Sequence, residues 1–376
     1  MAVGAKDPVL VVVQLSGGND YLNTVIPYTD PIYHESRPTV GVPEDEVLPI
    51  DDKLAFHPAL APVKKRFWDT EKMALVHGVG YPNPNRSHFR SMDIWHTCEP
   101  DKLGTEGWLG RAIRDLDPKG ENVLTGVNFD QGLPRALAVT GVPVSSVAQL
   151  ERYGVLTGIS PEEERNQALE VFARVYGPTI GTSFVMDYLA QTGRDVLKGA
   201  DVIKTVPGKY SSTIEYASSS IAKKLRSIAM VHLADVGTRV FYTSHAVYDT
   251  HSTQVKDYQN LWGELGPALV DFYDDLEEHN AAQNVVILLF TEFGRRVRDN
   301  GSGTDHGSGG GAFLIGDKIK SGMYSQYPSL KPEEQLDGDL QFNYDFRGFY
   351  SSVLEQHMGL DPTEIVGGTF EQLNFI

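Results

Sequence analysis

The stretch VLVVVQLSGGND, residues 9–20, decides the fold class. Val9–Leu15 is a run dominated by β-branched side chains, and it ends at Ser16 and two glycines. A long apolar run bounded by glycines is typical of a strand that is buried on both of its faces. Strands of this kind occupy the middle of parallel sheets. The stretch therefore predicts a central parallel strand close to the beginning of the chain.

Four later segments have the same character and are predicted strands: Met73–Val79, Arg239–Tyr242, Asn284–Phe290 and Ala312–Ile315. Helices are expected at about Ser218–Ala234 and Tyr258–Glu278, before two of these strands. Strands that alternate with loops and helices indicate an α/β fold with a mostly parallel sheet. In such sheets, ligands bind beyond the carboxyl ends of the strands.

Two regions depart from this alternation. Two helices, Pro161–Tyr176 and Thr182–Lys204, follow one another with no strand between them, which predicts a helical insert or lid at residues 150–215. Pro27–Pro62 is rich in prolines and acids and is predicted to be a long surface excursion. We expect the whole chain, residues 1–376, to form one domain around the sheet.

Composition excludes several classes of protein. The 33 basic and 50 acidic residues give a net charge of −17, and such a surface repels nucleic acid and anionic membranes. The longest apolar run, Val285–Phe290, is far short of the ~20 residues that span a bilayer. Cys98 is the one cysteine, so no intrachain disulfide forms. The first residues lack a signal-peptide pattern, which suits both a trimmed exported protein and a cytoplasmic one.

Polar residues of one chemical kind follow the predicted strands. The following carboxylates and imidazoles are candidate metal ligands: Asp20, Asp249, His251, Glu292, Asp305 and His306. Because the carboxyl ends of parallel strands meet at one edge, we expect these side chains to converge. A mixed set of this kind suits a borderline divalent cation such as Zn²⁺ or Mn²⁺, with Mg²⁺ and Ca²⁺ left open, as is the number of cations.

The other candidate residues would handle an anionic substrate. Ser87 is a candidate nucleophile, activated by the metal, and Arg86 and Arg295 are candidate donors to phosphate or sulfate oxygens. We assign four further residues to substrate binding: Asn19, His88, Arg90 and Arg296. Other roles remain open, since Asp and Ser are also favoured helix N-caps and arginine pairs are commonly solvated.

At these residues the chain resembles DUF1501 (domain of unknown function 1501), a family of bacterial proteins of unknown function. The resemblance is carried, in order along the chain, by Val11–Tyr28, Arg86-Ser-His-Phe, Gly107-Trp-Leu-Gly-Arg111, Gly237-Thr-Arg-Val-Phe-Tyr242, Asp249-Thr-His-Ser252, Thr291-Glu-Phe-Gly-Arg-Arg296, Gly303-Thr-Asp-His-Gly307 and Asp345-Phe-Arg347.

The resemblance implies a place in the alkaline phosphatase and sulfatase superfamily, with a three-layer α/β sandwich and metals at the strand ends. It also implies export to the periplasm, often by twin-arginine translocation. By position, Asp20 matches a metal aspartate, Ser87 the nucleophile, Asp249 and His251 a metal pair, and His306 the last metal histidine.

One position departs from the superfamily pattern. An Asp-His pair is expected directly after Asn284–Phe290, but Glu292 and Phe293 stand there, and phenylalanine cannot bind a metal. One metal, or an altered site, is therefore expected. The leading hypothesis is a metal-dependent hydrolase of small anionic phosphate or sulfate esters. The alternatives are a non-catalytic binding or assembly protein on the same scaffold and a metal-dependent mutase or transferase. The oligomeric state is left open.

Overall fold

The computed structural model describes residues 7–148 and 202–376, together with residues 150, 163–164, 167–168, 170–171 and 199. Almost all of the predicted insert helices, Pro161–Tyr176 and Thr182–Lys204, lies outside the described residues. The insert and the single-domain organisation therefore stay predictions.

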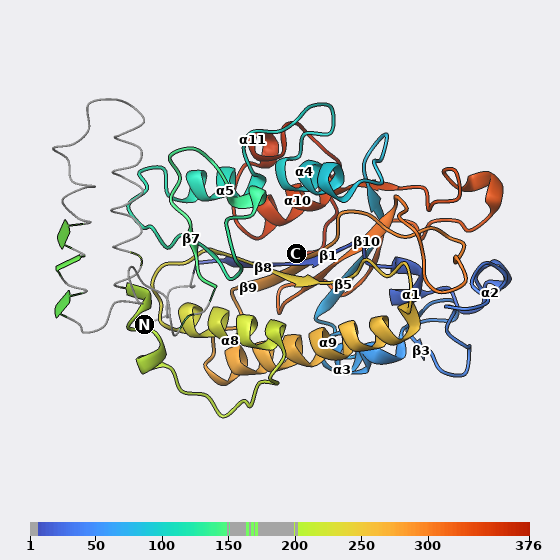
Figure 1. The fold of residues 1–376 in the computed structure, drawn as a ribbon, viewed down its shortest axis with the longest axis horizontal. Coiled ribbons are helices and arrows are strands. Elements are labelled where there is room, and N and C mark those ends of the chain that lie inside the picture. The colour runs from blue at the N-terminus through green and yellow to red at the C-terminus, as the bar shows by residue number, and fades with distance from the viewer. Residues whose placement is uncertain are drawn as a thin grey trace.

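A nine-stranded sheet forms the middle layer of the described part of the chain (Figure 1). Its strand order is β11-β5-β10-β9-β1-β8-β6-β7, with β12 paired to β5, and a small second sheet has the order β2-β4-β3. The strands are β1 (Val9–Ser16), β2 (Val25–Ile26), β3 (Leu48–Pro49), β4 (Ala55–Phe56), β5 (Met73–Gly80), β6 (Gly126–Asn128), β7 (Ser145–Ser146), β8 (Val240–Ala246), β9 (Val285–Phe290), β10 (Gly310–Ile315), β11 (Gly322–Tyr324) and β12 (Tyr344–Asp345).

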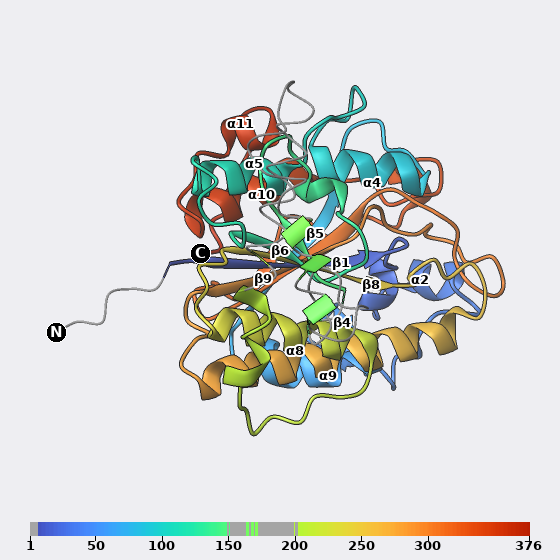
Figure 2. The same ribbon diagram turned by 60° about the vertical axis from the view of Figure 1, so that its left-hand side comes forward.

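Helices cover both faces of this sheet (Figures 1 and 2). In Figure 1, α3, α8 and α9 lie below the sheet, and α4, α5, α10 and α11 lie above it. The helices are α1 (Tyr21–Thr24), α2 (Pro31–Ser36), α3 (Ala61–Val63), α4 (His88–Thr97), α5 (Trp108–Leu116), α8 (Ser220–Leu233), α9 (Gln254–Glu278), α10 (Phe346–Gln356) and α11 (Pro362–Val366). The predicted α/β sandwich is confirmed.

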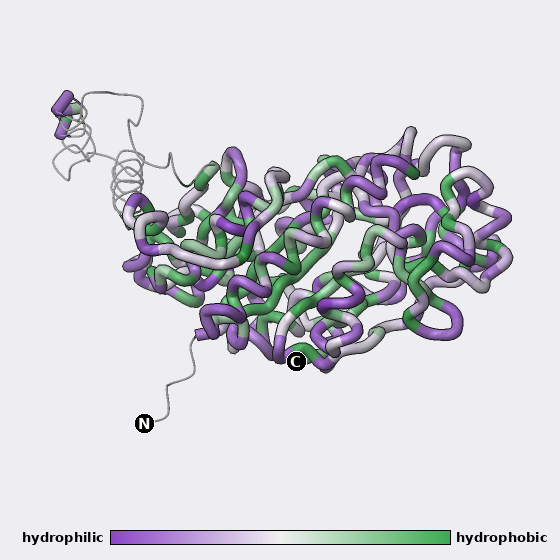
Figure 3. The backbone as a smooth tube through the Cα atoms, turned by 90° about the horizontal axis from the view of Figure 1, so that it is seen from below, coloured by the Kyte–Doolittle hydropathy of each residue, from purple (hydrophilic) through white to green (hydrophobic). Residues whose placement is uncertain are grey.

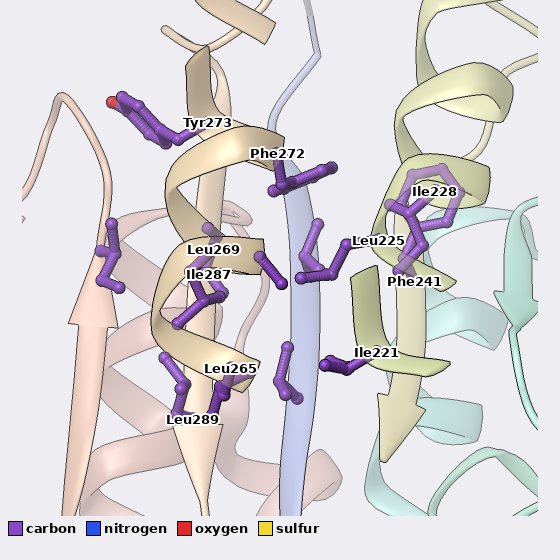
Figure 4. Packing of buried hydrophobic residues seen from close by; sticks show 14 of the residues in the cluster. Ile221, Leu225, Ile228, Phe241, Leu265, Leu269, Phe272, Tyr273, Ile287 and Leu289 are labelled. Atoms are coloured by element: carbon purple, nitrogen blue, oxygen red, sulfur yellow. The ribbon is translucent and has the colours of Figure 1, made fainter. Parts of the chain in front are cut away.

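Side chains of β1 alternate between two hydrophobic cores. Val11 and Val13 face the core that includes α8 and α9, whereas Leu10 and Val12 face the core that includes α4 and α10. Figure 4 shows the first core, where Leu225 of α8 and other labelled side chains pack against the sheet. Burial on both faces explains the long apolar runs, and the strands form hydrophobic bands through the interior in Figure 3.

The direction of β10 differs from that of the other large strands. β1 pairs in parallel with β8 and β9, but β10 is antiparallel to both β5 and β9. β9 and β10 are therefore joined by one loop, residues 291–309, at the carboxyl edge of the parallel strands. Had β10 been parallel, the segment that precedes it would lie at the opposite edge. The reversal is what brings residues 303–307 to the same edge as the segments after β1 and β8.

The predicted surface excursion Pro27–Pro62 contains more structure than its composition indicates. It contributes β3 and β4 to the small sheet, and Phe56 and Arg37 within it are buried. No helix in the described part of the chain has the length and hydropathy that a membrane crossing requires.

Candidate metal centre

Three chain segments meet at the carboxyl edge of the sheet: the start of α4, the segment after β8 and the loop between β9 and β10. Each supplies one of the residues His88, Asp249 and His306, and one ligand atom from each lies within 4.8 Å of the others. His251 is next to this group, with its Nε2 atom 2.9 Å from His306 Nε2 and 3.1 Å from Asp249 Oδ1. These four residues are called the His₃Asp cluster below.

Asp249 is the centre of the His₃Asp cluster. Its Oδ1 atom accepts hydrogen bonds from Arg295 Nη2 at 2.8 Å and is 3.0 Å from His306 Nε2. Partial burial alone would raise the pKa of Asp249, but the hydrogen bond and the positive charge of Arg295 outweigh it, and the pKa is lowered to about 2. Asp249 is therefore a charged carboxylate at neutral pH, ready to face a cation.

His306 presents a bare nitrogen to Asp249. Its Nδ1 atom lies 2.8 Å from the carbonyl oxygen of Arg86, and since a carbonyl only accepts, Nδ1 carries the hydrogen. Burial lowers the pKa of His306 below 6.5, which favours the neutral ring at pH 7. The neutral ring with a proton on Nδ1 has a lone pair on Nε2, the form that binds a metal.

His251 is held in the same way by Asp305. Its Nδ1 atom lies 2.8 Å from Asp305 Oδ1, so the carboxylate accepts the Nδ1 hydrogen and leaves Nε2 directed at Asp249. The hydrogen bond from His251 lowers the pKa of Asp305. Asp305 was a candidate metal ligand from the sequence, and the structure places it against His251.

His88 is oriented by Glu292. The two meet at 2.9 Å between Nδ1 and Oε1, and Gly17 N–H donates to the same carboxylate oxygen. His88 Nε2 is buried, lies 3.5 Å from Asp249 Oδ2 and has no hydrogen-bond partner among the described residues. The hydrogen bond to Glu292 raises the pKa of His88, so a proton competes with any cation for this ring. Glu292 thus lies behind His88 rather than in the cluster, and His88, assigned to substrate from sequence, offers the ligand atom.

Phe293 packs beside two of the imidazoles. Its ring centroid is 4.9 Å from that of His88 and 4.9 Å from that of His306. Phe293 therefore packs against two of the rings beside Asp249 and supplies no ligand atom itself.

One nitrogen each of His88 and His306 and a carboxylate oxygen of Asp249 lie close enough to hold a divalent cation, and His251 Nε2 lies beside His306 and Asp249 as a further ligand atom. In the neutral rings, each histidine donates its Nδ1 hydrogen to an acceptor outside the cluster. The Nε2 atoms and the Asp249 carboxylate therefore face one another with no hydrogen between them. Such an arrangement is stabilised by a cation or by added protons. The donor set suits Zn²⁺ or Mn²⁺ better than the all-oxygen preference of Ca²⁺ or Mg²⁺.

Arg295 joins the segments that carry the site. Its buried guanidinium donates to the carbonyl oxygens of Gly17, Gly18, Tyr248 and Thr304, in addition to Asp249. Sequence analysis assigned Arg295 to substrate oxygens, but the structure uses it to hold three loops together. The guanidinium is buried, and each of its three nitrogens already donates to a protein oxygen, so it is poorly placed to bind a substrate.

We expect Arg295→Met to lower the free energy of unfolding by about 3 kcal/mol, because several buried carbonyl oxygens lose their donor at once. Urea denaturation measures the change. Arg298→Met is the matched control, since Arg298 is exposed in the same loop. Equal stability of the two variants would contradict the assigned role.

Asp20 lies apart from the His₃Asp cluster. Its carboxylate is ion-paired with Arg37 at 2.5 Å, and both side chains are fully buried. Gln254 Nε2 donates to the same oxygen at 2.5 Å. A divalent cation placed about 4 Å from the guanidinium would be repelled by roughly 8 kcal/mol at an effective dielectric constant of about 20. The structure therefore does not bring Asp20 to the predicted shared cation.

Ser87 borders the cluster and is exposed. It is the N-cap residue of α4, but its side chain makes no capping hydrogen bond. The residue before it supplies the carbonyl that fixes His306, and the residue after it is His88. Ser87 is thus held between two residues that are tied to the cluster, and its hydroxyl makes no capping hydrogen bond within the described part of the chain.

Arg86 and Arg296 are engaged by acids from the loop before β12. Arg86 Nε donates to Asp339 Oδ2 at 2.9 Å, and Arg296 lies 3.6 Å from the other oxygen of Asp339. Asp337 also pairs with both guanidiniums. Arg86 stays more than a third exposed, so it remains reachable from solvent.

Two other residues assigned to substrate binding lie elsewhere. Asn19 is buried, with its backbone N–H donating to Thr291 Oγ1 and its side chain to Thr24. Arg90 pairs with Asp93 along α4 at 2.6 Å. Neither side chain joins the His₃Asp cluster.

Comparison with known proteins gives a family but no curated relative. A family model described as "Protein of unknown function (DUF1501)" matches residues 7–372. The resemblance inferred from the motifs is confirmed over nearly the whole chain. A search of curated proteins found no match.

Solved structures similar to this chain include three proteins at low identity. The C-terminal periplasmic domain of EcEptC from Escherichia coli, in complex with Zn, has 10% identity and a TM-score of 0.43 over 98% of this chain and 89% of that chain. An alkaline phosphatase from the Antarctic bacterium TAB5 has 10% identity and a TM-score of 0.34 over 85% and 95%. A 2-O GAG sulfatase has 9% identity and a TM-score of 0.37 over 98% and 76%.

Proposed function

The chain belongs to the DUF1501 family of proteins of unknown function, and from the geometry of its own site we propose that it is a divalent-cation-dependent hydrolase of phosphate or sulfate esters. The observation that supports this most is the tautomer pattern of the His₃Asp cluster. Arg86 O, Asp305 and Glu292 each accept an Nδ1 hydrogen, so that bare Nε2 atoms surround Asp249.

Ser87 is the proposed nucleophile. Its oxygen attacks phosphorus or sulfur, the bond to the ester oxygen breaks, and the alcohol leaves with the proton from Ser87. Water then cleaves the phosphoseryl or sulfoseryl group, which releases the inorganic anion and restores the hydroxyl. The cation, when bound, would favour the deprotonated hydroxyl and offset the negative charge of the substrate oxygens.

The protein groups around Ser87 would orient the anion. The first N–H groups of a helix favour negative charge, and Ser87 is the N-cap of the ten-residue helix α4. Arg86 is the exposed guanidinium nearest along the chain, although reaching a substrate requires it to leave Asp339. Its partial exposure supports that role.

The location of the protein, its domain organisation and the type of group transfer belong to the same proposal. We place the activity in the periplasm or another exported location and propose that the chain forms a single domain. A mutase or transferase would use the same covalent step on Ser87.

A non-catalytic binding protein is the second candidate. It is favoured by the buried Arg295 and by the engagement of Arg86 and Arg296 with acids, because few guanidinium groups are left for an anion. This candidate differs from the first in a single measurable property, the turnover of an ester.

An assay with defined cations tests the proposal. Chelator-stripped protein is reloaded separately with Zn²⁺, Mn²⁺, Mg²⁺ and Ca²⁺ and supplied with aryl phosphate and aryl sulfate esters. We expect turnover with Zn²⁺ or Mn²⁺ and loss of it in His306→Ala, whereas His34→Ala, an exposed histidine of α2, keeps it. Background rates for every ester and cation would reject the hydrolase and favour the non-catalytic protein.

A further inference from the structure

Arg37 is a buried cation supplied by the chain itself. It follows α2, within the segment between β2 and β3, and its side chain has no exposed surface. The guanidinium donates to Asp20 Oδ2 at 2.5 Å, to Asn23 Oδ1 at 2.8 Å and to the carbonyl oxygens of Arg296 and Val297 at 2.8 and 3.0 Å. Four oxygen atoms thus surround one fixed positive charge.

These acceptors come from the segments that continue into the site. Asp20 and Asn23 lie just beyond the glycines after β1, whose carbonyls are held by Arg295. The two carbonyls that bind Arg37 belong to the residues immediately after Arg295. The guanidinium of Arg37 therefore neutralises a carboxylate on a segment that Arg295 links to Asp249 of the His₃Asp cluster.

The charge of Asp20 is paired without a metal. One of its oxygens receives both Arg37 and Gln254 Nε2, and that glutamine in turn accepts from Thr304 Oγ1 at 2.6 Å. The other oxygen, Oδ1, is buried and has no hydrogen-bond partner in the described part of the chain. The negative charge of the carboxylate is nevertheless matched by the adjacent guanidinium, whose positive charge repels a further cation.

We infer that Arg37 takes the place of a second metal ion at Asp20, so that the protein binds one divalent cation, at the His₃Asp cluster. This inference rests on the cation centre proposed above and adds its count. It also explains why Asp20 is present after β1 although no Asp-His pair follows β9. Asp20 binds a guanidinium of the same chain in place of a metal ion.

Metal counting tests the inference without measuring activity. Purified full-length protein is saturated with Zn²⁺, passed through a desalting column and analysed for metal per chain, with affinity from competition against a chromophoric chelator. We expect one equivalent for the wild type and for Asp20→Asn, with affinities within about twofold, and more than 100-fold weaker binding for His306→Ala.

A second variant guards against misfolding. Asp20→Asn leaves Arg37 buried without its counter-ion and can unfold the protein, so Asp20→Asn/Arg37→Met removes both charges and is expected to keep one equivalent. Two equivalents in the wild type, of which one is lost in either variant, would overturn the inference and leave the proposed function standing. No bound Zn²⁺ in the wild type would overturn both.

Discussion

Replacement of Asp249 by Asn is expected to weaken cation binding by more than about 100-fold and to reduce ester turnover to background. Asp249 Oδ1 lies 3.0 Å from His306 Nε2 and 3.1 Å from His251 Nε2, so its charge is the one that the imidazoles share. An amide keeps the shape of the side chain but removes that charge. Competition with a chromophoric chelator measures the affinity, and an aryl ester assay measures turnover.

The control for this variant is Asp235→Asn. Asp235 is exposed in the turn between α8 and β8, at the opposite edge of the sheet, and its left-handed backbone conformation suits asparagine as well as aspartate. We expect it to behave as the wild type. If Asp249→Asn kept full affinity, the cation would have to bind elsewhere, and the His₃Asp cluster would be a set of protonated hydrogen bonds.

Removal of the Ser87 hydroxyl is expected to separate chemistry from metal binding. In Ser87→Ala, turnover falls by about 10³-fold or more because the covalent step has no nucleophile, while cation affinity stays within about twofold. Stability should change by less than about 0.5 kcal/mol, because the side chain makes no capping hydrogen bond. Steady-state rates, chelator competition and urea denaturation together make the comparison.

Ser227→Ala, on α8, is the matched control, since its hydroxyl bonds only within its own helix. Undiminished turnover in Ser87→Ala would remove the covalent mechanism and leave direct attack by water as the chemistry. Loss of cation binding in the same variant would show instead that the start of α4 had moved.

Most of the fold was predictable because its central strands are buried on both faces. The apolar runs of β1, β5 and β9 were located within one residue of their ends, and α8 and α9 were found from their helical pattern. The direction of β10 was not predictable, because an apolar run of six residues is the same in either orientation. That direction is nevertheless what brings His306 to the site.

The acidic and histidine residues of the site were predictable from the sequence, but the role of each residue was not. Asp249, His251 and His306 were proposed together, and they lie together. From the sequence, Glu292 was a metal ligand and His88 a substrate residue, but the structure places His88 in the cluster and Glu292 behind it. This arrangement depends on a contact between residues 204 positions apart, which their spacing along the chain does not reveal. Arg37 was missed because it belongs to a proline-rich and acidic stretch that resembles a surface loop.

The Nδ1 partners of the three histidines have a consequence for ion selectivity. Glu292, Asp305 and the Arg86 carbonyl hold the three rings by hydrogen bonds that do not require an ion, so the positions of the Nε2 atoms are set in advance. A preorganised set of ligand atoms loses little conformational entropy when an ion binds, and it favours ions whose radius matches its spacing. Small ions that take nitrogen ligands in tetrahedral geometry would bind tightly. Ca²⁺ would bind weakly, because it needs six to eight oxygen ligands at longer distances.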